Sequence, residues 1–529
     1  MPTADHIIGQ GSPSAAALSS EPSLPATDAG PAGRTWDRER IITAAVVAAV
    51  VVVGVVLRIW VVASNLGPVD SDEAAGGLIA RHFLQGEGAV FLWGNNYGGT
   101  LEAILTAPIF AVFGSGVVTL KLVPIGAFAA ACVLTWRIGL RTVGPDAARL
   151  GAAILWVASG PVVLISTKAR LYYGTALVLT CAVVLLCLRL AEAPSRRDVA
   201  VLGLVLGLGL WTAPFVFYVA VPALLWLATR RPRLVFDIPW AIPGALLGSS
   251  PWLWYNLRTG WDALRELRGS PVPTTYLDRL YNFYTELLPK LVGLRTYHGP
   301  WSLGPAGKVL FVLLLVAGVT LVVWSLWRRR SAMIPLVVIA VAYPFVYAAP
   351  QSSWYTGEPR YGLFLAPVLA LLVAWVVTAV LRRPPLQVAA LALLVLTTVA
   401  GLQSLMDYGK KNPGHHDLTP RRLGTLADTL EREGVRTVVA DYWIAYALSF
   451  ESRERIIATP KPGQVRYGPY QRRVADAGAR TYVYFQGQSW GEAVEAAARD
   501  ADIGTRKLTV DGFDIYLFDR PVGHPPPPD

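Results

Sequence analysis

Charged side chains are scarce in this sequence: Asp, Glu, Lys and Arg together make up 16% of its 529 residues. Soluble proteins carry about a quarter. The scarcity excludes an ordinary soluble domain, because the segments between the charges are long and almost entirely apolar. A helix needs about 20 mostly apolar residues to cross a bilayer, and such runs recur along the chain. We therefore predict an α-helical polytopic membrane protein.

Cysteine and histidine are also few, with three and six residues. Cys132, Cys181 and Cys187 all fall in apolar runs, which argues against a disulfide framework and a cysteine metal site. His298 and the pair His415-His416 have no matched ligand spacing. No glycine-rich, phosphate-cradling loop precedes a helix, and no internal repeat is visible. The sequence therefore indicates no certain cofactor.

The formal net charge is +11, yet it gives no indication of nucleic acid as a partner. The basic residues lie mainly in short connections between apolar runs, as the positive-inside rule requires of cytoplasmic loops. They cluster at Arg196-Arg197, Arg230-Arg231, Arg328-Arg329-Arg330 and Arg382-Arg383. The partner that this distribution indicates is the lipid bilayer.

The alternation of these charges predicts about eleven transmembrane helices with a cytoplasmic N-terminus. Leu101–Phe113 is apolar but too short to span comfortably. A crossing there would also place Arg137 and Arg141 outside, so we predict a helix at the outer membrane surface. The predicted spans are about 41–63, 117–136, 147–166, 173–190, 199–211, 213–229, 234–252, 305–327, 332–350, 361–381 and 385–404.

This topology divides the chain into four predicted parts. Residues 1–33 form a disordered cytoplasmic tail, and 34–404 form the transmembrane domain with a first outer loop at 64–116. Residues 405–521 alternate helix-like and strand-like pieces, which predicts a small extracytoplasmic α/β domain. Its pieces are the helical pattern Leu423–Glu433, the β-branched run Val435–Ala440, and then Tyr442–Phe450, Arg455–Ala458, Tyr482–Phe485, Gly491–Arg499 and Phe513–Phe518. A Pro-rich tail, 522–529, follows.

The segment Pro68-Val69-Asp70-Ser71-Asp72-Glu73-Ala74 places three carboxylates within four positions, directly after the first span. Carboxylates at a helix N-terminus have a structural use, because they cap free N–H groups and complement the helix dipole. The functional alternative is a general base in a partly desolvated site. The segment alone leaves both interpretations open.

Five cations are predicted near the outer ends of spans: Arg58, Lys121, Lys168, Arg170 and Arg360. Each alone is explained by snorkelling to the interface. A charge in or near the hydrocarbon, however, is costly and usually pairs or lines a functional cavity. Together, opposite an acidic loop, these side chains have the chemistry to hold a lipid-linked phosphate.

At these residues the sequence resembles the GT-C glycosyltransferases, which include protein O-mannosyltransferases and lipid A aminoarabinose transferases. Asp72-Glu73, one short loop after the first span, is similar to the acidic motif of that superfamily. In many relatives arginine stands in place of Lys121. The resemblance extends over about 41–405 and includes Ala80-Arg81-His82-Phe83-Leu84, Tyr97-Gly98-Gly99-Thr100-Leu101-Glu102, Lys121-Leu122-Val123-Pro124, Lys168-Ala169-Arg170-Leu171-Tyr172 and Arg360-Tyr361.

The resemblance implies an inverting transfer of a sugar from a polyprenyl-phosphate donor to an acceptor hydroxyl at the outer face of a bacterial cell membrane. Asp72 would be the base and Glu73 would position the acceptor or the base. Asp70 would assist either or bind a divalent cation, Mg²⁺ or Mn²⁺. The donor phosphate would be held by Lys121, Arg170 and Arg360, with Arg58 and Lys168 as further candidates.

Four more residues are candidates for substrate binding. Tyr97 lies in an outer loop where its ring would stack on sugar, although interface belts enrich tyrosine anyway. Glu102 lies in an apolar helix and would line either the cavity or an exposed face. Tyr172 and Tyr361 end two of the segments that resemble the superfamily.

Other functional classes stay open on the sequence. A transporter or flippase of lipid-linked sugars would need alternating access and often shows inverted repeats. A polysaccharide ligase or polymerase would share the cationic pocket, and an assembly protein would use the C-terminal domain for a partner. For a transferase, the acceptor is a cell-envelope glycan, a lipid or a protein.

Overall fold

The computed structural model describes residues 38–266, 274–297, 299–327, 332–350, 358–411 and 421–523. The chain forms two compact units, Met1–Val46 and Val47–Asp529. All predicted site residues lie in the second unit.

Three of the sequence predictions fall outside the described residues. They are the tail 1–33, the histidines His298, His415 and His416, and the tail 522–529 apart from its first two residues. The division of the chain at 404 also stays a prediction, and the last apolar helix continues past it to Lys411.

Among the described residues, six helices are long and apolar enough to cross a membrane, and each coincides with a predicted span. Together with the fold reported below, they support a multi-pass membrane protein. The helices are α1 (Arg38–Ala63), α4 (Val117–Thr142), α7 (Tyr173–Glu192), α14 (Pro305–Trp327), the 3₁₀ turn η4 (Pro359–Leu365) with α16 (Ala366–Val380), and α17 (Pro384–Lys411).

The other five predicted spans lie on helices that are shorter, interrupted or less apolar, so the number eleven stays a prediction. These helices are α5 (Pro145–Val157) with α6 (Gly160–Ile165), α8 (Arg196–Thr212), η1 (Pro214–Val216) with α9 (Phe217–Arg230), α10 (Ile238–Thr259) and α15 (Ile334–Ala348). The short helices between them are η2 (Pro232–Asp237), α11 (Asp262–Glu266), α12 (Tyr276–Asn282), the π-turn η3 (Phe283–Leu287) and α13 (Leu288–Leu291).

The predicted span 147–166 is divided into α5 and α6 by a break at Ser159. This residue has φ +44°, in the left-handed region that interrupts a helix. Its hydroxyl accepts a hydrogen bond from the N–H of Val162 at 3.3 Å and so caps α6. Pro161 in the first turn of α6 lacks the N–H that a continuous helix would need. A count of apolar residues does not register these features.

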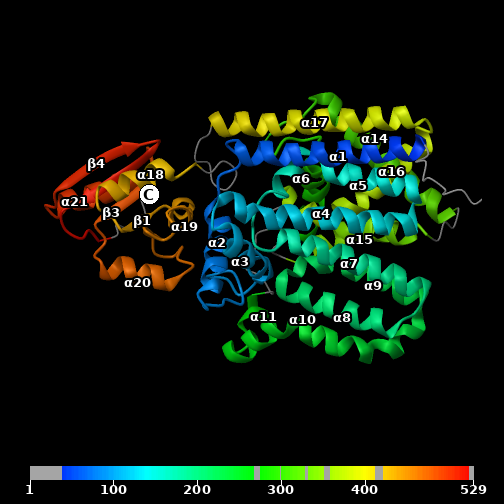
Figure 1. Ribbon diagram of the computed structural model, residues 1–529, viewed down its shortest axis with the longest axis horizontal. Helices are drawn as coiled ribbons and strands as arrows, with labels where there is room; N and C mark the ends of the chain where they lie inside the picture. The colour runs from blue at the N-terminus through cyan, green and yellow to red at the C-terminus, as the bar shows by residue number, and fades with distance from the viewer. Residues whose placement is uncertain are drawn as a thin grey trace, which may run out of the picture. The chain divides into compact units, whose positions relative to one another are not determined.

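Helices α8 and α10 lie side by side (Figure 1) and pack backbone to backbone. A Cβ on Gly203 or Gly207 would lie 2.1 and 2.3 Å from carbonyl oxygens of α10. A Cβ on Gly244 or Gly248 would meet α8 at 2.2 and 2.4 Å. The spacing of four in both helices is the small-residue pattern of close helix pairs in membranes.

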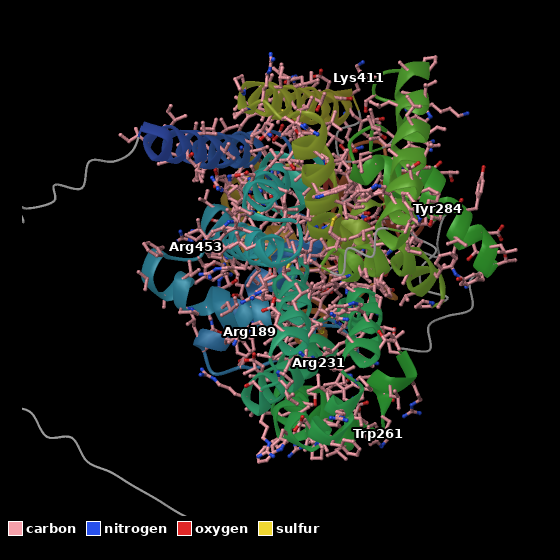
Figure 2. The ribbon with its side chains drawn as sticks, turned by 90° about the vertical axis from the view of Figure 1, so that its right-hand side faces the viewer. Arg189, Arg231, Trp261, Tyr284, Lys411 and Arg453 are labelled. Carbon is pink, nitrogen blue, oxygen red and sulfur yellow. The ribbon has the colours of Figure 1, made fainter. Side chains whose placement is uncertain are left out.

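Basic side chains lie at helix ends and bind neighbouring helices there, in agreement with the clusters of arginine between the apolar runs. Arg189 and Arg231, both labelled in Figure 2, lie near the ends of α7 and α9. Arg189 donates to both oxygens of Asp198 at 2.9 and 3.0 Å, and Arg231 donates to the carbonyl of Ala191 at 2.9 Å. These contacts join α7, α8 and α9 at one end.

The C-terminal residues form the predicted α/β region, with strands drawn from orange to red in Figure 1. Five strands have the order β2-β1-β3-β5-β4; β1 pairs with β2 and β3 in parallel, and β5 pairs with β3 and β4 antiparallel. The elements are α18 (Gly424–Arg432), β1 (Thr437–Ala440), α19 (Tyr442–Glu451), β2 (Ile457–Pro460), α20 (Gly468–Asp476), β3 (Thr481–Phe485), α21 (Ser489–Asp500), β4 (Thr505–Val510) and β5 (Phe513–Phe518).

Helix α2 (Ser71–Leu84), which follows the first span, shares the hydrophobic core of this region rather than that of the long helices. It packs on α19 and on α3 (Leu101–Phe113). A Cβ on Gly77 would lie 2.5 Å from the ring of Phe450, so the two helices approach closely. The predicted first outer loop and the C-terminal region are therefore packed together.

Candidate active site

The acidic segment begins α2 and separates its three carboxylates. Asp70 is the N-cap, and its Oδ1 accepts a hydrogen bond from the N–H of Glu73 at 2.9 Å. An α-helix turns about 100° per residue, so Asp72 projects from another side of α2 than Glu73. Asp70 and Glu73 are fully buried, whereas 24% of the Asp72 side chain is exposed. Asp70 thus has the structural use of an N-cap, whereas the general-base interpretation stays a prediction for Asp72.

Two of the carboxylates form a buried charge network with three of the predicted phosphate ligands. Glu73 Oε1 accepts from Lys121 Nζ at 2.8 Å, and its Oε2 accepts from Lys168 Nζ at 3.0 Å. Asp70 Oδ2 accepts from Arg170 Nη2 at 3.0 Å. The members of this buried charge network are Asp70, Glu73, Lys121, Lys168 and Arg170.

The network keeps Glu73 ionised. Burial opposes its charge, but the ammonium groups of Lys121 and Lys168 outweigh burial and lower the pKa of Glu73 to about 2. For Asp70 burial is the larger effect and raises the pKa above its usual value, while Arg170 opposes the rise. Two carboxylates facing three cations leave one positive charge in excess. Glu73 therefore serves to neutralise and hold cations rather than to accept a proton.

The same network fixes the loop that carries Lys168 and Arg170. Glu73 Oε1 accepts a second hydrogen bond, from the N–H of Ala169 at 2.7 Å. Leu171 has φ +44°, a strained conformation that persists only where the surroundings enforce it. Gly76 leaves room for Leu171, because a Cβ there would lie 2.8 Å from its Cγ. Helix α2 thus clamps this loop from Ala169 to Leu171.

Asp72 has different partners, which come from the C-terminal region. Its Oδ1 accepts hydrogen bonds from the hydroxyl of Tyr442 and from Arg466 Nη2, the latter at 3.0 Å. Burial and then the Asp72 carboxylate raise the pKa of Tyr442 well above its ordinary value, so this hydroxyl stays protonated and donates. Within the described ranges, Asp72 Oδ2 has no hydrogen-bond partner. One oxygen is held, and the other is available.

A cavity beside the network collects three of the predicted phosphate ligands. Its lining includes Lys168 and Arg170, from the loop before α7, and Arg360 in η4. Tyr173 and Tyr297 add hydroxyl groups and ring faces to the lining. Guanidinium groups at such a place match the geometry of a phosphate.

Three predicted substrate-binding tyrosines, Tyr97, Tyr172 and Tyr361, interact electrostatically with one another. The hydroxyl of Tyr172 interacts electrostatically with both Asp72 and Arg360, and also with Tyr97 and Tyr361. Burial raises the pKa of Tyr172, and these neighbours modify the rise. Tyr97 interacts in turn with Asp72. Tyr172 is therefore within electrostatic range of both Asp72 and Arg360.

The glycine pair that follows Tyr97 is required by close contacts. Gly98 has φ +77°, and a Cβ there would lie 2.7 Å from the ring of Tyr172. A Cβ on Gly99 would lie 2.5 Å from the carbonyl oxygen of Trp211. The Gly-Gly segment thus sets the distance between Tyr97 and Tyr172.

Three predicted site residues lie elsewhere. Lys121 is in the buried network but does not line the cavity described above. Arg58 stacks on the ring of Trp156, with 3.7 Å from its Cζ to the ring centroid, and donates to the carbonyl of Gly54. Glu102, in the first turn of α3, is buried, and its Oε2 accepts from the N–H of Thr175, at the start of α7, at 3.5 Å. The sequence positions of Lys121 and Arg58 near span ends did not distinguish them from Arg170 or Arg360.

A divalent cation at the acidic loop does not fit the side chains well. The ammonium and guanidinium groups of the network already occupy the oxygens of Asp70 and Glu73. Of the three carboxylates, Asp72 alone is left to ligate a cation, whose other oxygen ligands would have to come from water or substrate. In the part of the chain that is described, no group of three His, Cys, Asp or Glu residues is arranged to hold a metal. We derive no step through a metal.

Sequence reasoning missed Arg466. The segment Asp441-Tyr442-Trp443 ends a predicted strand, and the sequence alone leaves it open whether the segment contacts an acceptor or packs. Tyr442 directly follows β1, and Arg466 lies in the loop after β2. Ligands of α/β sheets bind beyond the carboxyl ends of parallel strands. That rule could have identified Tyr442, but applying it requires knowing which strands pair in parallel. Arg466 lies six residues after the end of β2, so the rule does not identify it.

An acidic anchor fastens α2 to the C-terminal region and predicts a pH dependence of stability. Glu454 accepts from Arg81 and His82 of α2, both at 3.0 Å, and from Tyr470 at 2.6 Å. Burial opposes the charge of Glu454, but the hydrogen bonds from His82, Tyr470 and Arg81 outweigh it and lower the pKa to about 2.

A carboxyl whose pKa is lowered on folding stabilises the fold above its unfolded pKa, about 4.3. That contribution should be lost as the pH falls from about 4.3 towards 2. We expect wild type to melt at a higher temperature than Glu454→Gln at pH 6, and the difference to shrink towards pH 2. The exposed Glu492→Gln is the control and should follow wild type throughout. A difference that does not change with pH would contradict the prediction.

The fold is similar to those of two solved structures, ArnT and the oligosaccharyltransferase AglB. ArnT from Cupriavidus metallidurans, solved with undecaprenyl phosphate bound, aligns over 90% of this chain and 98% of its own, at 13% identity and a TM-score of 0.59. The oligosaccharyltransferase AglB from Archaeoglobus fulgidus, in complex with an inhibitory peptide and a dolichol-phosphate, aligns over 91% of this chain and 74% of its own, at 12% identity and a TM-score of 0.51.

The same archaeal enzyme in complex with zinc and sulfate aligns over 90% of this chain and 73% of its own, at 13% identity and a TM-score of 0.51. No protein-family model and no curated protein matches the sequence. The predicted GT-C-like fold, helical with a small C-terminal α/β part, is confirmed. At these identities the likeness concerns the fold alone.

Proposed function

We propose that this protein is an inverting glycosyltransferase that moves a sugar from a polyprenyl-phosphate donor to an acceptor hydroxyl. The observation that carries the proposal is the division of the acidic segment. Asp72 keeps one carboxylate oxygen available, while Asp70 and Glu73 form ion pairs with buried cations. A cavity lined by Lys168, Arg170 and Arg360 lies beside the buried charge network. A base and a phosphate site are the two parts that this reaction needs.

In the proposed reaction the acceptor oxygen attacks the anomeric carbon of the sugar while Asp72 Oδ2 takes its proton. The bond between the anomeric carbon and the phosphate oxygen breaks, and polyprenyl phosphate leaves with the electron pair. Arg170 and Arg360 lie where they can neutralise the charge that develops on this phosphate. Their own carboxylate contacts, to Asp70 and Glu358, hold them in place.

The structural neighbours support this choice of donor. ArnT was solved with undecaprenyl phosphate and AglB with a dolichol-phosphate, which are both polyprenyl-type phosphates. By the positive-inside rule, the site faces outward and the C-terminal region lies outside a bacterial cell membrane, with the N-terminus in the cytoplasm. The acceptor is a glycan, a lipid or a protein of the cell envelope.

The test is sugar transfer by the purified protein in lipid. A panel of radiolabelled polyprenyl-phosphate sugars serves as donors and cell-envelope extract as acceptor. Transfer from one donor would support the enzyme and identify the sugar. A polysaccharide ligase or polymerase would instead require a polyprenyl diphosphate donor. Movement of lipid-linked sugar across the bilayer without transfer would overturn the proposal in favour of a flippase.

The cavity predicts a specific effect on donor binding. We expect Arg360→Gln to weaken binding of undecaprenyl phosphate about tenfold to a hundredfold, because a charged hydrogen bond to phosphate contributes about 1.5–3 kcal/mol. Tryptophan fluorescence titration of the protein in detergent would measure it. Arg258→Gln, at the exposed end of α10, is the matched control and should bind like wild type. Equal affinities for Arg360→Gln and wild type would contradict the assignment of this cavity to the phosphate.

A further inference from the structure

The C-terminal α/β region reaches the acidic segment through two side chains. Arg466 donates from Nη2 to Asp72 Oδ1 and from Nη1 to Asn95 Oδ1, both at 3.0 Å. Its Nε donates to the hydroxyl of Tyr442, which itself donates to Asp72 Oδ1. Asp72 Oδ1 therefore receives two hydrogen bonds, and both donors come from the C-terminal region.

The placement of Arg466 is enforced by its surroundings. The N–H groups of Arg466 and Tyr467 both donate to the hydroxyl of Tyr446, at 2.7 and 3.1 Å. The ring of Tyr467 stacks on Trp93, with 3.9 Å between centroids and 16° between planes. Next to this stack, Gly94 lies so close to Arg466 that a Cβ on it would be 2.7 Å from the Arg466 Cα. The segment Arg466-Tyr467 is thus packed tightly against Trp93 and Gly94.

These contacts bear on Asp72 alone among the three carboxylates. Asp70 and Glu73 are held by cations from α4 and from the loop before α7. Only 21% of the Arg466 side chain and 24% of the Asp72 side chain is exposed, so the pair is partly desolvated, and its hydrogen bonds are strengthened accordingly.

We infer that the C-terminal region is a working part of the active site: Arg466 and Tyr442 are positioning residues that hold Asp72 Oδ1 so that Oδ2 faces the acceptor. The inference rests on the proposed function of Asp72 as a base. It excludes a C-terminal region that only binds a partner. Neither residue needs to touch the sugar, because each acts through Asp72.

The test compares turnover with donor affinity in the full-length protein in lipid. We expect Arg466→Gln and Tyr442→Phe each to lower kcat about tenfold to a hundredfold, the effect of about 1 Å of misplacement of a reacting group. The KM for the donor should stay within about twofold, because the cationic cavity is intact. Arg466→Lys should recover part of the loss, since its ammonium keeps the charge but cannot reach both Asn95 and Asp72.

A matched variant separates positioning from stability. Arg81→Gln removes another arginine between α2 and the C-terminal region, the one that pairs with Glu454 at 3.0 Å, without touching Asp72. It should lower the melting temperature but leave kcat near that of wild type. Should Arg466→Gln fail to fold, Tyr442→Phe still tests the inference, because it removes a single hydroxyl group.

The outcomes distinguish this inference from the proposed function. Wild-type kcat in both Arg466→Gln and Tyr442→Phe, or an equal loss in Arg81→Gln, would overturn the inference while transfer by the wild type still upheld the enzyme. Absence of transfer by the wild type from every donor would instead overturn the proposed function itself.

Discussion

Asp72→Asn is expected to lower the turnover number of sugar transfer by about 10²–10⁴-fold, the usual contribution of a general base. The amide oxygen of asparagine can still accept from Tyr442 and Arg466, so the contacts that hold the side chain survive. The amide nitrogen that replaces Oδ2 cannot take a proton. The expected loss is therefore one of chemistry, with the fold and the donor cavity preserved.

Three measurements check this expectation on one preparation: turnover, undecaprenyl phosphate affinity and melting temperature. Asp476→Asn, on the exposed face of α20, makes the same chemical change away from the site and should match wild type in all three. Transfer at the wild-type rate by Asp72→Asn would refute the assignment of the base. The search would then turn to Asp70, since Glu73 is neutralised by two lysines.

Glu73→Gln is expected to cost about 3–5 kcal/mol of folding free energy, the usual effect of removing one partner of a buried ion pair. Glutamine can accept on its single oxygen, but the change removes the carboxylate charge that pairs with Lys121 and leaves Lys168 with the more distant Asp70 carboxylate, at 4.0 Å. It also places an NH₂ group where Glu73 now accepts from Lys168 or from Lys121 and Ala169. The expected loss of folding free energy therefore has two causes: a buried positive charge that is no longer neutralised, and hydrogen-bond donors that face one another.

Unfolding by denaturant, followed by circular dichroism, measures this cost. Glu431→Gln breaks the more exposed pair with Arg455 on the C-terminal region and should change stability by less than about 1 kcal/mol. Adding Lys121→Met to Glu73→Gln should restore part of the stability, because the second change removes one of the uncompensated charges. A Glu73→Gln protein as stable as the Glu431→Gln control would show that the buried charge network contributes little.

Periodicity and length predicted the local elements where burial and sequence pattern agree. The apolar segment Leu101–Phe113 is a helix over that range, and the β-branched run before Ala440 is β1. Helix α20 and strand β4 were missed because they are mostly polar. In α20 only Tyr470 and Val474 are buried, and β4 is an edge strand with charged side chains.

The site shows the same division between local and distant information. The helical turn that separates Asp72 from Glu73 is a local property and was available from the sequence. What each carboxylate meets is not local: Glu73 and Lys121 are 48 positions apart, and Asp72 and Arg466 are 394 positions apart. Five cations near span ends looked equivalent, yet only Lys168, Arg170 and Arg360 line the cavity.

The sequence by itself determined that this chain crosses a membrane, where its acidic segment begins a helix, and which superfamily its motifs resemble. Those properties depend on hydropathy, caps and spacing within about one helix length. Only the tertiary structure decided that Glu73 is a clamp for two lysines and that Asp72 is held by Tyr442 and Arg466. The physical reason is that a carboxylate has the same intrinsic chemistry at either position, and its role is decided by burial and by partners brought from distant parts of the chain.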